Sequence, residues 1–269
     1  MPVFERLSMV VSLTLIGLAL YFVIDLPAQR VALNFLGAPV AVTVSARLLM
    51  VLLLGGLAFT GAGAVVHSHP GRRVGYTSPF WVNATLIVIL ATLTLARLGG
   101  AAAWAAGLLA TGALLWVVLL AEYRLVQAAG PGATLARLWS QGVSYALMLA
   151  YAVLIFQSPM GVVWRLLSVA AIGWLLAASV FQSGEPPALR VGLLSFLVAL
   201  GLGQLAWVFT FWPVGPTGAA VLTLLVFYGL CGAVATAAQG TFLWRVSLEY
   251  GFVAAAGLAM VLALGGNAV

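Results

Sequence analysis

The segment "TGAAVLTLLVFYGLCGAVATAA", residues 217–238, decides the fold class because it runs for 22 residues without one charged side chain. An α-helix rises about 1.5 Å per residue, so about 20 apolar residues cross a hydrocarbon core about 30 Å thick. The rest of the 269-residue chain has the same character, with 64% hydrophobic and 6% charged residues. Soluble domains carry roughly 25% charged residues. We therefore predict an integral membrane protein.

Similar apolar runs continue in both directions from this segment, and Gly, Pro and Arg residues separate them. They predict an all-α bundle of nine transmembrane helices in a single domain. The alternative is eight spans, with the third or fourth segment only re-entrant, because "RLGG" (97–100) leaves room for no more than a tight helical hairpin. The nine segments are about 7–24, 46–66, 80–97, 101–121, 139–157, 161–181, 190–212, 217–238 and 243–265.

The segment "RVALNFLGAPVAVTVS" (30–45) has a different pattern. Apolar residues alternate with period two on both sides of Gly37-Ala38-Pro39, which predicts a short β-hairpin near residues 31–44 on the outer face. The alternative is an extended re-entrant loop, which a membrane protein tolerates only where protein buries it.

Orientation follows from the arginines, which supply all eleven basic residues. With the N-terminus in the cytoplasm and the C-terminus outside, seven arginines lie on the inner side and four on the outer side, as the positive-inside rule requires. The adjacent Arg72 and Arg73 carry the most weight. The arginines are otherwise scattered singly, so the net charge of +6 does not indicate nucleic-acid binding. The single Cys231 excludes a disulfide within the chain.

Two Glu-Tyr pairs provide the main candidate site. Glu249 must lie below the interface, because the apolar run "GFVAAAGLAMVLAL" (251–264) downstream has only 14 residues, too few to span alone, and Arg245 shares its helical face four residues earlier. Glu122 ends the fourth segment beside Arg124, where a cluster reaching toward the headgroups explains it. Each glutamate is therefore either part of a structural ion pair or interface cluster, or a proton or cation site. The sharper hypothesis brings Glu122 and Glu249 together on the inner side.

Other polar residues provide weaker sites. His67 and His69 are too few to hold a metal, so with Arg72 and Arg73 they are candidates for contact with anionic headgroups. No metal or other cofactor is predicted.

On the outer side, tryptophans flank three helix-end arginines, which form either an anion-attracting rim or an ordinary aromatic belt: Arg47, Arg97 and Arg165. Within the spans, we expect the amides of Asn83 and Gln204 and the hydroxyl of Ser195 to hydrogen-bond between helices.

The predicted partners are membrane lipids, with no nucleic acid. The segments "LGGLAFTGAGA" (54–64) and "FYGLCGAVATAAQG" (227–240) contain small residues that let helices approach closely. These Gly/Ala-rich faces indicate interior helices, or contacts with other proteins or a second copy.

Several stretches together resemble an uncharacterised, domain-of-unknown-function family of bacterial polytopic membrane proteins, mainly from the Chloroflexi lineage. They are "AEYRLV", "VALNFLGAPVAVTV", "FWPVGPTG", "FYGLCG" and "LEYGFV". The resemblance implies a multi-pass protein of the prokaryotic plasma (inner) membrane and carries no activity with it.

The favoured function is that of a non-enzymatic structural or accessory membrane component. The first alternative is a small transporter or channel that uses Glu249 and Glu122 on the inner side. The second alternative is a lipid-processing membrane enzyme.

Overall fold

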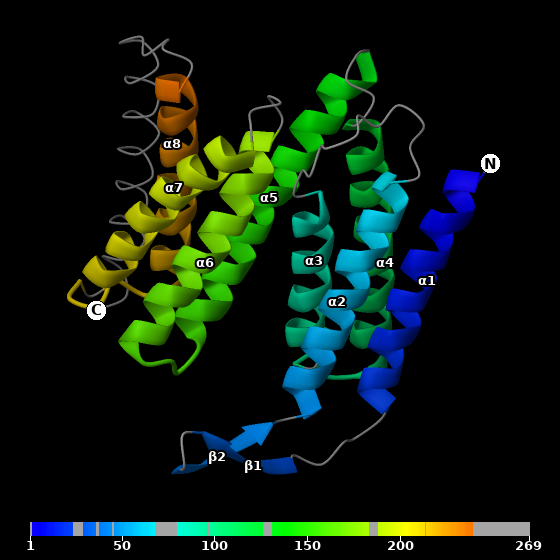
Figure 1. Cartoon of the computed structure of the whole chain (residues 1–269), viewed down its shortest axis with the longest axis horizontal. Coiled ribbons are helices and arrows are strands. Elements are labelled where there is room, and N and C mark those ends of the chain that lie inside the picture. The colour runs from blue at the N-terminus through cyan, green and yellow to red at the C-terminus, as the bar shows by residue number, and fades with distance from the viewer. Residues whose placement is uncertain are drawn as a thin grey trace. The chain divides into compact units, whose positions relative to one another are not determined.

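The computed structural model describes residues 2–23, 29–35, 38–44, 46–67, 80–95, 97–125, 131–182, 188–212 and 214–238. Apart from one pair of strands, these residues form eight helices (Figure 1). The ninth predicted segment, 243–265, lies outside the described residues. The helices are α1 Pro2–Val23, α2 Ala46–His67, α3 Trp81–Leu95, α4 Ala101–Leu125, α5 Pro131–Gln157, α6 Val162–Phe181, α7 Ala188–Val208 and α8 Pro216–Ala238.

Seven of these helices are long and apolar enough to cross a membrane, which indicates a multi-pass membrane protein. Their outward-facing leucines agree with lipid as the solvent: Leu109 is 71% exposed and Leu189 is 77% exposed. The exception is α3, whose 15 residues reach only about 22 Å. It is buried along most of its length, and its connection to α4 is tight. Gly100, with φ of 93°, takes the left-handed conformation that this turn requires.

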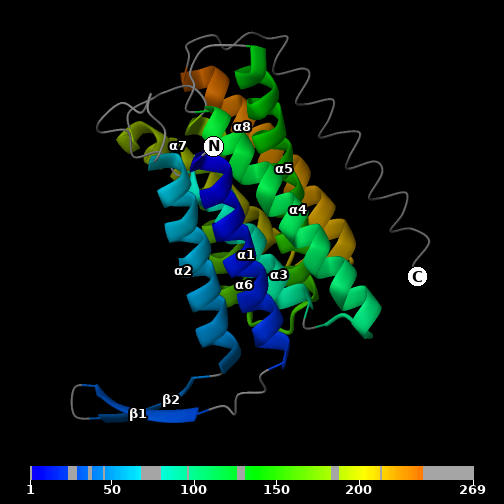
Figure 2. The same ribbon diagram turned by 90° about the vertical axis from the view of Figure 1, so that its right-hand side faces the viewer.

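The strands β1 (Gln29–Phe35) and β2 (Ala38–Val44) pair antiparallel within the segment for which the sequence predicts a hairpin. Figure 2 shows the pair beyond the ends of α1 and α2. Two residues of the predicted turn, Ala38 and Pro39, belong to β2, opposite Phe35 and Asn34. The outer location of this hairpin stays a prediction.

Four helix boundaries lie four or more residues from their predicted positions, and the first of them is the start of α1, at Pro2 rather than residue 7. The fourth helix runs to Leu125 rather than residue 121, so Glu122 lies inside it. The fifth begins at Pro131 rather than residue 139, because proline suits the first turn of a helix, where its missing N–H is not needed. The seventh ends at Val208 rather than residue 212. After Val208 the chain forms turns with hydrogen bonds between residues three apart, such as that from Thr210 N to Trp207 O.

The chain divides into two compact units. Unit 1 comprises Met1–Arg73 and Phe80–Ala129, and unit 2 comprises Val74–Pro79 and Gly130–Val269. Unit 1 therefore contains α1 to α4 and the strands, and unit 2 contains α5 to α8.

Close packing at glycines sets the spacing of the helices in unit 1. A Cβ atom placed on Gly61 of α2 would lie 2.5 Å from Val10 Cγ1 of α1. A Cβ on Gly112 of α4 would lie 2.8 Å from Leu15 Cδ1 of α1. At such distances the facing side chain would have to shift to make room for a Cβ, so these glycines allow close helix contact. They include one glycine of the small-residue segment 54–64.

Unit 2 is built in the same way. A Cβ on Gly173 of α6 would lie 2.4 Å from Leu202 Cδ1 of α7. At the opposite end of α7, Arg190 donates a hydrogen bond to the backbone O of Ala238, in the last turn of α8. This contact satisfies a carbonyl that the helix leaves without a partner and places a positive charge at its negative end.

Candidate functional site

Glu122 is the most unusual side chain in the part of the chain that the structure describes. It lies in the last turn of α4 on the same face as Leu115 and Leu119, at the spacing that aligns residues along one side of a helix. Both leucines belong to the core of unit 1. Glu122 is 1% exposed, as deeply buried as its apolar neighbours.

The helix contacts show what lies at the level of Glu122. Gly112 of α4 meets Leu15 of α1, and the two helices run in opposite directions (Figure 1). Ten residues beyond Gly112, about 15 Å, is Glu122, and ten residues before Leu15 on α1 is Glu5, with Leu7 about 3 Å short of that level. Leu7 is itself fully buried. The buried Leu7 of α1 therefore lies within one helical turn of the level of this carboxyl.

Among the described residues, no hydrogen bond offsets the burial of the carboxyl group. Oε1 and Oε2 are both buried and lack a hydrogen-bond partner among the described residues. An isolated ionised carboxylate is too costly to keep in apolar surroundings, and such groups become neutral instead. Even a neutral polar group left without a partner costs about 1–3 kcal/mol. The site can therefore hold a proton in an apolar interior.

Among the described residues Glu122 and Arg124 form no cluster, and the interface depth of Glu122 stays a prediction. The interface-cluster interpretation requires the carboxyl to reach the headgroups, whereas the structure buries it inside unit 1. Arg124 is exposed and forms no ion pair with Glu122. Two residues along a helix turn the side chain by about 200°, so these neighbours in sequence point to opposite sides.

Glu249 and Arg245 lie outside the described residues, so their pairing and their approach to Glu122 stay predictions. The same holds for His69, Arg72 and Arg73. His67 is the last residue of α2, at the end of unit 1 where Glu122 lies (Figure 1).

The three arginines of the predicted outer rim belong to different units. Arg97 is exposed in the turn between α3 and α4, and Arg47 lies in the first turn of α2, both in unit 1. Arg165 lies in the first turn of α6, in unit 2. Within the described residues, no cluster of three or more His, Cys, Asp or Glu side chains could hold a metal.

Of the polar side chains expected to hydrogen-bond between helices, Ser195 bonds within its own helix instead. Its hydroxyl donates to Val191 O, 2.7 Å away. Gln204 is exposed on α7. Sequence reasoning missed the apolar groove beside Gln204, because its walls come from two helices whose register only the structure gives.

Comparison with known families gives one match. A family model described as a protein of unknown function (DUF5656) matches residues 26–264. The chain belongs to this family. The match confirms the resemblance to an uncharacterised family, and the range matched to DUF5656 includes Glu122 and begins after α1. No curated protein and no solved structure matches the chain.

Proposed function

We propose that this chain is a small membrane transporter or channel that carries protons, with Glu122 as the buried group that binds and releases them. One observation carries the proposal: a fully buried glutamate in a transmembrane bundle whose carboxyl oxygens have no hydrogen-bond partner among the described residues. Ionisable residues at such positions are costly and are typically functional.

The position of Glu122 along α4 supports a proton route. The helix ends three residues later, so the carboxyl lies only about 4.5 Å along the axis from the helix end. A proton arriving from that end has a short distance to travel. Glu249, with Arg245, is the proposed second acid on the inner side, as the sequence predicts.

The test is a proteoliposome assay with the full-length protein. A potassium gradient with valinomycin drives protons inward, and a trapped pH-sensitive dye reports acidification. We compare wild type with Glu122→Gln, using Glu5→Gln as the matched control, because Glu5 is an exposed acid of the same unit. We expect rapid acidification with wild type and with Glu5→Gln, and the rate of empty liposomes with Glu122→Gln. Rates equal to empty liposomes for both wild type and Glu122→Gln reject the proposal.

A second candidate is the accessory or structural membrane component. Its supporting observation is an exposed face of small residues on α2, formed by Gly56, Thr60 and Ala64 at intervals of four. A Cβ on Gly56 would meet nothing within 4 Å, and the Thr60 hydroxyl is used by its own helix, donating to Gly56 O at 2.9 Å. Such faces bring transmembrane helices of different chains together. Crosslinking in native membranes tests this role: Gly56→Leu should abolish a crosslinked oligomer that wild type forms.

A further inference from the structure

The hairpin formed by β1 and β2 has two chemically different faces. Successive residues of a strand alternate between the faces of a sheet, and residues paired across an antiparallel ladder share a face. The register places eight residues on one face, which we call the apolar face of the hairpin: Gln29, Val31, Leu33, Phe35, Ala38, Val40, Val42 and Val44. The other face contains the remaining polar residues together with alanines and a proline: Arg30, Ala32, Asn34, Pro39, Ala41 and Thr43.

The described helices do not cover the apolar face of the hairpin. Figure 2 shows the hairpin beyond the ends of α1 and α2, and among the described residues neither strand packs along a helix. A two-stranded hairpin with no further strand or helix against it is marginally stable in water. The apolar face therefore requires another neighbour.

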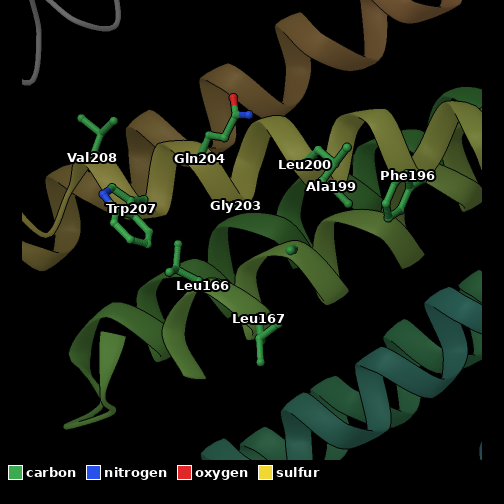
Figure 3. Close-up of a pocket in the computed structure, with 10 residues that line it drawn as sticks. Leu166, Leu167, Phe196, Ala199, Leu200, Gly203, Gln204, Trp207 and Val208 are labelled. Atoms are coloured by element: carbon green, nitrogen blue, oxygen red, sulfur yellow. The ribbon is translucent and has the colours of Figure 1, made fainter. Parts of the chain in front are cut away.

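A different apolar surface lies in unit 2, where α6 and α7 form a groove of about 510 Å³. Figure 3 shows Leu166 of α6 and Trp207 of α7 on the two sides of this groove. All of its lining residues belong to helices that are long and apolar enough to cross a membrane. The lipid that surrounds any spanning helix is therefore its expected neighbour. The hairpin contains no spanning helix, so its apolar face needs a separate explanation.

The connection to α2 fixes the level of the hairpin. Strand β2 ends at Val44 and α2 begins at Ala46, so these two residues lie at most about 7 Å apart. The candidate span of α2 begins at Leu49, about one helical turn further on. The headgroup layer on each side of a bilayer is about 5–8 Å thick. The end of β2 therefore lies at or beside the headgroup layer when α2 crosses the bilayer.

The direction of the strands keeps the rest of the hairpin near that level. Figure 1 and Figure 2 both show β1 and β2 running across the direction of α1 and α2 rather than continuing along it. Each strand also has one edge that is not paired with another strand. Unpaired backbone N–H and C=O groups are too costly in the hydrocarbon core, whereas water reaches them in the headgroup layer. The hairpin is thus suited to the surface of the bilayer and not to its interior.

From the two faces and this location we infer that the hairpin lies flat on the bilayer, with its apolar face against lipid and the face that contains Arg30, Asn34 and Thr43 in water. Elements with one apolar and one polar side bind membranes in this way, with the apolar side at the boundary between headgroups and acyl chains. The surface is separate from the proton site proposed at Glu122, and the inference does not depend on proton transport.

The experiment measures collisions of nitroxide labels with oxygen, which concentrates in lipid, and with a nickel chelate, which stays in water. The full-length protein is held in liposomes of phosphatidylglycerol and phosphatidylcholine, with the buried Cys231 changed to alanine. Labels are attached one at a time on the apolar face, at Val31→Cys, Leu33→Cys and Val42→Cys, and on the other face, at Ala32→Cys, Asn34→Cys and Ala41→Cys. The reference for lipid contact is Leu109→Cys, because Leu109 is 71% exposed in a candidate span.

We expect oxygen collisions to dominate at the three positions of the apolar face, as at the reference, and nickel collisions to dominate at the other three. Nickel collisions that dominate at all six positions overturn the inference, because the hairpin then projects into water. Labels on the apolar face that neither reagent reaches also overturn it, because protein, either another segment of this chain or a partner, then covers that face.

A charge placed on each face tests whether lipid contact holds the hairpin on the membrane. With the label at Val42→Cys, Leu33→Asp should abolish the excess of oxygen collisions, because a carboxylate on the apolar face opposes contact with acyl chains. Ala32→Asp is the matched control on the opposite face and should leave the excess unchanged. An unchanged excess in Leu33→Asp, or an equal loss in both variants, contradicts the assigned faces.

Discussion

Replacing Glu122 by leucine should stabilise unit 1, which is unusual for a change at a fully buried position. The carboxyl is 1% exposed and neither oxygen has a hydrogen-bond partner among the described residues. Leaving such a group unsatisfied costs about 1–3 kcal/mol. Leucine is apolar and similar in volume, so it removes this penalty with little change in packing. We therefore expect Glu122→Leu to raise the free energy of unfolding by about 1–3 kcal/mol.

The measurement is unfolding of the detergent-solubilised full-length protein by titration with a denaturing detergent, followed by circular dichroism. Leu119→Ala serves as the reference for ordinary core damage, because Leu119 lies on the same face of α4 and is fully buried. Truncations of this kind cost about 2–5 kcal/mol. Glu5→Leu controls for the loss of one negative charge, since Glu5 is exposed on α1. Its effect should stay within about 0.5 kcal/mol.

A loss of stability in Glu122→Leu comparable to that in Leu119→Ala would refute this reasoning. It would mean that the carboxyl makes a favourable contact in the folded protein, either with residues outside the described ranges or with a bound ion. A gain of stability together with lost proton flux would instead identify a residue that is kept at the expense of stability. This trade-off is expected at functional sites.

Three further predictions concern packing and helix ends. Gly173→Ala should lower the free energy of unfolding by about 1–3 kcal/mol, because its Cβ would lie 2.4 Å from a leucine of α7. Gly142→Ala should be neutral or slightly stabilising, because its Cβ would meet nothing within 4 Å, and the same detergent titration compares the two variants. Arg190→Gln should speed hydrogen exchange in the last turn of α8, because Ala238 O loses its donor. Cys231 is buried, so N-ethylmaleimide should label it only after denaturation, as mass spectrometry of the intact chain will show.

Hydropathy predicts the helices well, because a span needs only length and apolar composition, and both are visible in the sequence. It predicts their ends less well. The run "AAGPGATLAR" contains Gly and Pro and resembles a loop, yet α5 begins at Pro131. Proline marks a helix start as readily as a break, and only the backbone distinguishes the two.

The environment of Glu122 could not be predicted because the predicted end of the fourth helix lies four residues too early. Placing the helix end at residue 121 moves Glu122 into the interface, where the adjacent Arg124 provides an obvious partner. The helix in fact continues to Leu125, and the turn of the helix then separates the two side chains. The groove between α6 and α7 is a similar case, because it depends on which residues of two helices lie opposite each other. Hydropathy contains no information on register.

Helix α1 packs against α4, the helix that contains Glu122. The family match begins at residue 26, after α1 ends, whereas Glu122 lies well inside it. Yet α1 places the buried Leu7 within one helical turn of the level of Glu122 and packs against α4 where Leu15 meets Gly112. The acid thus belongs to the segment that defines the family, while part of its apolar cover comes from the helix before that segment. We therefore expect the seclusion of the carboxyl from water to depend in part on how α1 packs, so that a displacement of this helix exposes Glu122 to protons.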